Sequence, residues 1–210
     1  MTVEYLGHSS FLLTAADGTR LVTDPYAGIG YPMPHAEAEY VVCSHGHADH
    51  ANVRGVAGAK EVLTESGRHT LGAFTVTGIP AWHDEVHGAK RGRSIVYRIE
   101  ADGQCVCHMG DIGQPPESGL LAQIGSPDVL LVPVGGVYTV DDAGAAEYVR
   151  LICPKITVPM HYHLPGGTLG IAPPDAFLKR MGAENCVRMR KLSLPCPEAE
   201  GKTVVLEVKR

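Results

Sequence analysis

The stretch VVCSHGHADHANV, from Val41 to Val53, ends an apolar run with four ionisable side chains within six residues. Alternate side chains of an extended segment face the same way, which places His45 and His47 together. A loose helical pattern over 48–58 predicts that the chain then turns. Asp49 and His50 would therefore point away from His45 and His47 and could bind a second ion a few ångströms away. Neutral imidazole is the commonest metal ligand, and this spacing fits two neighbouring ions. Alone, the stretch also fits a structural zinc site or a polar loop.

Later apolar runs end in further residues of the same kind. His83 follows GIPAW, Asp111 follows CHMG, His161 follows TVPM, and Asp24 follows LVT. Buried or half-buried histidine and aspartate side chains need partners, so convergence of these strand ends on one sheet edge is hard to explain by packing alone. The sequence therefore predicts a metal site with several His and Asp ligands at that edge.

Composition and charge narrow the class of protein. The 210 residues are expected to form a single domain, 1–210, of ordinary globular composition, with 44% hydrophobic and 20% charged residues. No apolar segment is long enough for a membrane helix, and a net charge of -5 disfavours nucleic-acid binding. No signal-peptide pattern precedes the first strand, and the six cysteines are scattered, so we expect a cytoplasmic protein with reduced thiols.

Strand-length runs dominate the chain, with a few helical periods between them. The expected strands cover 3–15, 20–25, 40–46, 61–66, 74–82, 94–101, 104–111, 128–136, 155–162 and 203–210, and further helices are expected over 117–124, 141–153 and 173–183. Asp141 and Asp142 are capping residues for the longest of these helices, and Pro154 ends it. The pattern predicts mixed β-sheets with helices on their outer faces.

The order of these motifs resembles the metallo-β-lactamase fold hydrolases. The resemblance rests on GHSSFLL, TDP, HGHADH, PAWHD, GDIG and the late VPMHY, and it spans Gly7 to Tyr162. Within that superfamily, the chain is similar to the small metal-dependent hydrolases related to ascorbate-6-phosphate lactonases and N-acyl-phosphatidylethanolamine phospholipase D enzymes. The resemblance implies an α/β protein with a four-layer α/β/β/α sandwich and the site at one edge.

The resemblance also implies a ligand set for two divalent ions. The first ion would take His45, His47 and His83, the second would take Asp49, His50 and His161, and Asp111 would bridge them. Asp24 and His8 would lie behind the ligands, with Asp24 orienting a ligand histidine. For His8, a buried histidine that ties a loop by hydrogen bonds is favoured over a role beside the site.

The implied ligands indicate hydrolytic chemistry. Imidazole and carboxylate ligands suit zinc, and manganese or iron are alternatives. Two cations would turn a bridging water into a hydroxide that attacks an ester, lactone, amide or phosphodiester bond. Asp49 would steer this nucleophile or carry its proton. The redox branch of the fold has a carboxylate where His47 stands, so the sequence favours hydrolysis over di-iron redox chemistry; metal binding without turnover is the other alternative.

Substrate contacts are expected from loops beyond the ligands. Tyr138 and Thr139 follow a Gly-Gly turn, and His87 stands four residues after His83. HDEVH differs from the zincin motif at Asp84, and nearby proline and glycine disfavour the helix that such a site requires. His163 is a further candidate. The substrate is expected to be a small molecule, and the basic run KRGR would favour an anionic one if it faces the site.

Overall fold

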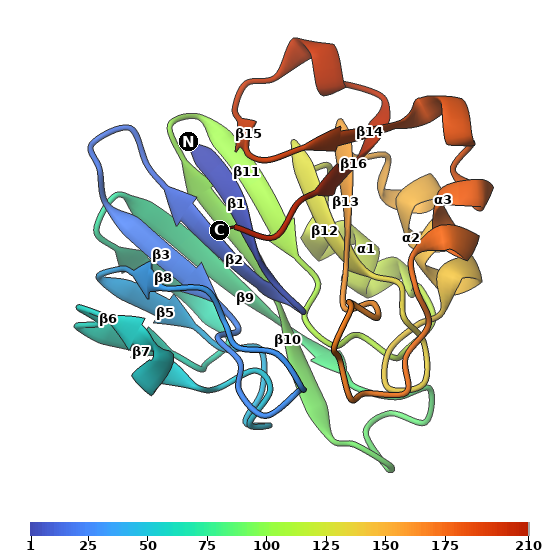
Figure 1. Cartoon of the computed structure of the whole chain (residues 1–210), viewed down its shortest axis with the longest axis horizontal. Helices are drawn as coiled ribbons and strands as arrows, with labels where there is room; N and C mark the ends of the chain where they lie inside the picture. Colours follow the sequence, from blue (N-terminus) through green and yellow to red (C-terminus); the bar gives the residue numbers. More distant parts are fainter. Residues whose placement is uncertain (210) are drawn as a thin grey trace.

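The computed structural model describes residues 1–209 and contains two large β-sheets (Figure 1). The first sheet has the order β15-β1-β2-β3-β5-β7, and the second has the order β14-β16-β13-β12-β11-β10-β9-β8. The first is built from β1 (Thr2–Gly7), β2 (Ser10–Thr14), β3 (Arg20–Thr23), β5 (Tyr40–Val42), β7 (Glu61–Leu63) and β15 (Leu192–Ser193). The second contains β8 (Gly67–Leu71), β9 (Phe74–Trp82), β10 (Arg93–Ala101), β11 (Gln104–His108), β12 (Val129–Pro133), β13 (Ile156–Met160), β14 (Cys186–Met189) and β16 (Lys202–Leu206).

The helices lie on the second sheet. They are α1 (Ser118–Ile124), α2 (Asp142–Ile152) and α3 (Asp175–Arg180), with three short 3₁₀ turns at η1 (Val53–Gly55), η2 (Ala183–Asn185) and η3 (Pro197–Ala199). Contacts join α1 to β9, α2 to β12 and α3 to α2. In Figure 1 this helical layer stands beside β12 and β13, away from the first sheet. The expected layered α/β arrangement is therefore observed, with the difference that the α-helices of residues 1–209 all belong to the layer on the second sheet.

Burial patterns explain why these segments form strands. Along β9, buried and half-buried side chains alternate over the first four residues, as expected for a strand with one face in the core. In contrast, every residue of β12 and β13 is buried, which is typical of parallel strands covered on both faces. One core contains Val3 and Phe11 from the first sheet together with Val96 from the second, so the two sheets pack against each other.

The helix expected over 48–58 is not present, and this prediction was wrong. Residues 48–50 form a turn, and only η1 is helical in this segment. Gly55 and Gly58 favour other conformations, and β-branched Val53 and Val56 lower helix propensity. The outer face of the first sheet is instead covered by this segment and a two-stranded ribbon of β4 (Ala36–Glu37) and β6 (Val56–Ala57).

The longest helix follows the sequence expectation closely. Asp141 accepts hydrogen bonds from the backbone N–H groups of Ala143 and Gly144, so it is the N-cap of α2. Asp142 is instead the first helical residue. Cys153 ends α2 in the left-handed conformation directly before Pro154. The predicted strand 203–210 is shorter as β16, and residue 210 lies outside the described residues.

Strand direction brings the ends of six strands to one edge. β1 and β3 both run antiparallel to β2, and β5 is parallel to β3, so these three strands share one direction. β9 and β11 both run antiparallel to β10, and β13 follows β11 through the parallel strand β12. The chain thus leaves β1, β3, β5, β9, β11 and β13 next to the residues that the sequence singles out: His8, Asp24, His45, His83, Asp111 and His161.

The cysteines and the helix lengths complete the picture of residues 1–209. All six cysteines are free, and Cys105 and Cys107 are both buried on β11, as expected for thiols that pack on one face. Burial raises the pKa of Cys105 to about 11, so its thiol stays protonated at neutral pH. In this part of the chain no helix is long and apolar enough to cross a membrane.

Candidate metal centre

The side chains at this edge form three overlapping groups whose potential ligand atoms lie within 4.8 Å of one another. The first group draws its members from the ends of β5 and β9, and the second joins the ends of β1, β5 and β13. The first consists of His45, His47 and His83, the second of His8, Asp49, His50 and His161, and the third of His45, His50 and Asp111. All seven residues expected as ligands are therefore brought together, and His8 joins them.

The first group opens to solvent. The centroid of the His45 ring lies 4.6 Å from that of the His47 ring and 4.7 Å from that of the His83 ring. His47 is exposed, His45 is half-buried and His83 is buried. Burial, together with the neighbouring His50, lowers the pKa of His45 to about 3. His45 is therefore neutral at physiological pH, which is the form that binds a cation.

The second group is more deeply buried. The Nε2 atoms of His8 and His50 are 3.2 Å apart, and Asp49 Oδ2 lies 3.4 Å from the first and 3.6 Å from the second. Burial would raise the pKa of Asp49, but His8 and His50 outweigh it and lower the pKa. Asp49 is thus an ionised carboxylate, and its side chain keeps 28% of its surface exposed.

Asp111 stands between the two groups. Its Oδ2 lies 3.2 Å from His50 Nε2, 3.3 Å from His161 Nε2 and 3.5 Å from His83 Nε2. Burial opposes the charge of this carboxylate, but the surrounding histidines, His161 and His50 above all, hold its pKa well below its ordinary value. One anionic oxygen therefore faces candidate ligands of both groups.

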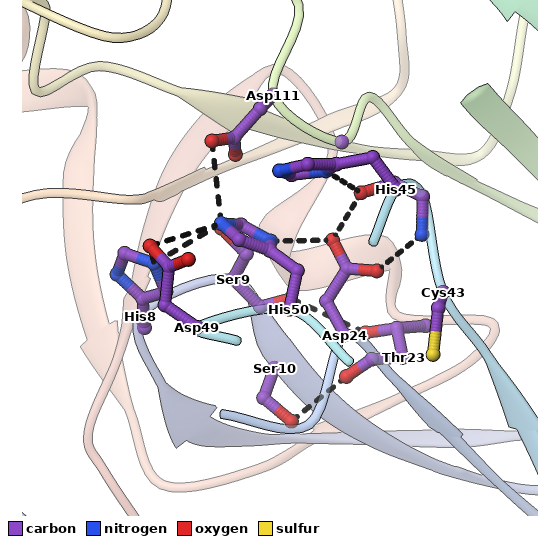
Figure 2. A network of polar contacts seen from close by, with 12 residues as sticks. His8, Ser9, Ser10, Thr23, Asp24, Cys43, His45, Asp49, His50 and Asp111 are labelled. Carbon is purple, nitrogen blue, oxygen red and sulfur yellow. Dashed lines mark hydrogen bonds and ion pairs between the residues drawn. The ribbon is translucent and has the colours of Figure 1, made fainter. Parts of the chain in front are cut away.

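Asp24 holds two of the histidines from behind. His50 Nδ1 donates to Asp24 Oδ2 over 2.9 Å, which directs Nε2 toward Asp49 and Asp111. Figure 2 shows His50 between Asp24 on one side and Asp49, His8 and Asp111 on the other. Ser44 donates from its backbone N–H and its hydroxyl to Asp24, each over 2.6 Å, and its Oγ lies 3.0 Å from His45 Nδ1.

Several buried polar atoms of the cluster have no hydrogen-bond partner within residues 1–209. They are His8 Nδ1, His45 Nε2, His83 Nδ1, His161 Nδ1 and Nε2, and Asp111 Oδ1. A buried polar atom left without a partner costs about 1–3 kcal/mol. A cation bound among these imidazoles and carboxylates would supply the missing partner for atoms that offer a lone pair, such as His45 Nε2. The donor set therefore fits a metal.

Three residues of the site have an unusual backbone conformation. His8, Asp24 and His161 have φ angles of 54°, 38° and 50°, in the left-handed region that glycine prefers. Such strain costs stability and tends to persist at functional sites. All three residues directly follow the last residue of an observed strand, β1, β3 or β13, and His8 and Ser9 divide the predicted strand 3–15 into β1 and β2.

Four other candidates lie outside the three groups. The His87 side chain is 69% exposed, and its Nε2 lies 3.5 Å from Glu117 Oε1. Residues 83–91 are bends and turns, in agreement with rejection of the zincin motif. Tyr138 is 37% exposed beneath the Arg91 guanidinium, and Thr139 donates to its neighbour's carbonyl. His163 is exposed.

Sequence reasoning missed the role of Ser44, whereas it predicted that His108 is packed or lies behind the ligands. Ser44 stands directly before His45, but its bonds to Asp24 depend on a strand pairing between β3 and β5 that no local pattern reports. His108 is fully buried, with Nε2 2.7 Å from the Ser9 carbonyl, and Nδ1 accepts from Gly110 N–H. It positions backbone and lies outside the three groups.

Metal affinity is expected to rise with pH. Burial disfavours the charged form of His50, but Asp111 and Asp24 outweigh it and raise its pKa well above 6.5. A metal must displace this proton, so affinity should increase about tenfold per pH unit from neutrality up to the raised pKa. Zinc competition titrations between about pH 7 and about pH 8.5 test this, and an affinity that does not change with pH would contradict it.

The same proton affects the metal-free fold in the opposite direction. Because the folded pKa of His50 is raised, its contribution to stability is fully present below about pH 6.5 and is lost as the pH rises through the folded value. Denaturant titrations of the metal-free protein measure this trend.

Replacing Asp24 is expected to weaken metal binding without removing a ligand. Asp24→Asn keeps the size of the side chain but loses the charge that orients His50, and changes of this kind cost about 10-fold to 100-fold in affinity. The control is Asp128→Asn, because Asp128 also accepts a backbone N–H bond, from Cys105, but precedes β12 at the opposite end of the sheet. Equal zinc affinity in the two variants would argue against the role of Asp24.

Known proteins that are similar to this chain identify its class. A family model described as a beta-lactamase superfamily domain matches residues 2–161. A UPF0173 metal-dependent hydrolase of Carboxydothermus hydrogenoformans is 32% identical over 78% of this chain and 85% of its own length. Another, of Pelotomaculum thermopropionicum, is 30% identical over 78% and 85%.

A solved structure agrees with these relatives. It is described as a Zn-dependent hydrolase of the metallo-β-lactamase superfamily from Thermotoga maritima, is 34% identical, and covers 99% of this chain and 100% of its own with a TM-score of 0.80. The chain belongs to the metallo-β-lactamase superfamily and, within it, to the UPF0173 family of metal-dependent hydrolases. It is therefore an enzyme of the metal-dependent hydrolase class.

Proposed function

We propose that the protein is a dinuclear hydrolase, in which two divalent ions act together on one substrate. The observation that carries this proposal is the position of Asp111, whose Oδ2 lies within 3.5 Å of the Nε2 atoms of His50, His83 and His161. His83 belongs to the first group, and His50 and His161 belong to the second. A carboxylate shared in this way is suited to bridge two ions a few ångströms apart.

The ligands divide between the two ions by group. His45, His47 and His83 would hold the first ion. Asp49, His50 and His161 would hold the second, with Asp111 common to both. We propose zinc for both positions, because imidazole and carboxylate donors suit it. Manganese and iron accept similar donors and are tested alongside it.

The chemistry that two bound cations supply is a hydroxide at neutral pH and polarisation of the scissile carbonyl or phosphoryl oxygen. The protein's own residues would orient the metal ligands and accept a proton from the attacking water. Asp24 fixes the ring of His50 through Nδ1, and Ser44 connects His45 to the same carboxylate. Asp49 Oδ2 faces His8 and His50, which leaves Oδ1 to accept the proton of the attacking water. Its lowered pKa keeps Asp49 ionised for this task.

The substrate that we propose is a small anionic ester, lactone, amide or phosphodiester. The loop after β9 carries Arg91, whose guanidinium lies 5.6 Å from the centre of the Tyr138 ring. Asp84 shapes this loop by accepting hydrogen bonds from the N–H groups of Val86, Gly88, Lys90 and Arg91. Because this loop begins at His83, a member of the first group, we propose that Arg91 binds the carboxylate or phosphate of the substrate.

We also propose that the enzyme acts in the cytoplasm as a single domain, 1–210. The support for a reducing compartment is that all six cysteines, which fall within residues 1–209, are free. The support for one domain is the core that residues of both sheets share.

A hydrolase panel on metal-quantified protein tests the proposed function. The protein is stripped with a chelator, reloaded separately with zinc, manganese or iron(II), and assayed on carboxylate-bearing and neutral lactones, esters and amides, and on phosphodiesters. We expect activity to return only with metal, and anionic substrates to lose more activity than neutral ones in Arg91→Gln. No turnover by any loaded form would favour metal binding alone, and oxygen-dependent chemistry of the iron form would favour the redox alternative.

A further inference from the structure

We propose that His8 is itself a ligand of the second ion, through Nε2. This inference rests on the dinuclear site proposed above and adds one imidazole to its ligand set. His8 follows β1, at the far end of the chain from His161, and both lie within the second group. His8 is fully buried.

The first support is the spacing of donor atoms. Neighbouring ligands of a zinc ion, each about 2.0–2.1 Å from the metal, lie roughly 2.9–3.4 Å apart, with the shorter spacing when six ligands surround the ion and the longer when four do. His8 Nε2 lies 3.2 Å from His50 Nε2 and 3.4 Å from Asp49 Oδ2. The third side of this triangle, between His50 Nε2 and Asp49 Oδ2, is 3.6 Å. His8 therefore stands at the same spacing from the two ligands as they do from each other.

The second support is that the ring of His8 does not tie a loop. Its polar contacts within residues 1–209 are to Asp49 and His50, and its Nδ1 has no hydrogen-bond partner there. His108, another fully buried histidine close by, behaves in the opposite way, because both of its ring nitrogens bond to backbone groups. The comparison separates a histidine that supports the chain from one directed at the cluster.

The third support is that the backbone fixes His8 at some cost. Its φ of 54° is strained for a side chain of this size. The His8 carbonyl accepts bonds from Tyr5 Oη at 2.9 Å and from the His161 N–H at 2.8 Å. Gly7 precedes it with a φ of 104°, where a Cβ would lie 2.6 Å from Tyr26 Oη. The hydrogen bond from the His161 N–H to the His8 carbonyl links two members of the second group directly.

Cadmium NMR on the wild-type protein tests the proposal without a mutation. The protein is labelled with ¹⁵N-histidine and loaded with ¹¹³Cd²⁺, and scalar coupling identifies each imidazole bound to each ion. We expect the second ion to couple to His8, His50 and His161. His108 is the internal control and should show no coupling. Coupling to His50 and His161 without His8 would overturn this inference and leave the dinuclear proposal intact, whereas no cadmium at the cluster would overturn both.

A variant adds an independent readout. His8→Gln should weaken zinc binding at the second position by more than about 100-fold, beyond the usual effect of a residue that only supports a ligand. His163→Gln is the control, because His163 is exposed and lies outside the three groups. Thermal melting of the metal-free variants checks that both are folded. A folded His8→Gln protein that binds two zinc ions with wild-type affinity would contradict the proposal.

Discussion

Asp111→Asn is expected to abolish hydrolysis and to weaken the binding of both ions. The substitution preserves shape but removes the anion that faces both candidate groups, at 3.2 Å to 3.5 Å from three Nε2 atoms. Loss of a shared ligand should exceed the roughly 10-fold to 100-fold affinity loss caused by supporting residues. Zinc competition titrations give both dissociation constants, and the substrate found in the panel gives kcat/KM.

The control for Asp111→Asn is Glu117→Gln. Glu117 is a half-exposed carboxylate on the loop before α1, paired with exposed His87 rather than with a candidate ligand. It should keep both ions and full activity. If Asp111→Asn lost only one of the two ions and the other kept its affinity, Asp111 would be a ligand of a single ion, and the bridging role would be wrong.

Asp49→Ala is expected to lower kcat by about 100-fold to 10,000-fold, the range for loss of a positioned acid or base. The first ion should remain, because its three imidazoles lie in the other group, whereas the second ion should bind more weakly. Activity and zinc content measured on the same preparation separate the two effects. Saturating zinc should restore occupancy but leave kcat low.

Asp142→Ala is a matched control for Asp49→Ala. The Asp142 side chain is 25% exposed, close to the 28% of Asp49, and it forms an ion pair with Arg180 on the helical layer. We expect its activity and zinc content to equal those of the wild type. Full recovery of kcat in Asp49→Ala at saturating zinc would show that Asp49 serves only as a ligand, and would remove it from proton transfer.

Much of the site could be predicted because strand ends are a local property. Each apolar run that ends in His or Asp marks a position at the edge of a sheet. These ends then line up when the strands are parallel neighbours, or when two strands lie on either side of a strand that is antiparallel to both. This reasoning identified His83, Asp111 and His161 correctly as neighbours of the HGHADH stretch. The cap of α2 at Asp141 was likewise readable from residue type and position.

The features that could not be predicted depend on contacts between distant parts of the chain. The position of His8 within the second group depends on packing between β1 of one sheet and β13 of the other. Ser44 acquires its role only when β3 pairs with β5. The helix predicted over 48–58 does not form, because the amphipathic period of this segment is weak. Packing on the first sheet and the hydrogen bond from the Asn52 N–H to the Pro25 carbonyl stabilise turns there instead.

The most direct test of the dinuclear site is the metal content of the reloaded protein, measured together with its activity. Stripped protein is titrated with zinc, desalted and analysed by mass spectrometry of the metal, and hydrolysis is recorded at each step. We predict that the content saturates at two ions per chain and that activity rises mainly with the second equivalent, because the two groups share Asp111. Saturation at one ion per chain with full activity would contradict the account.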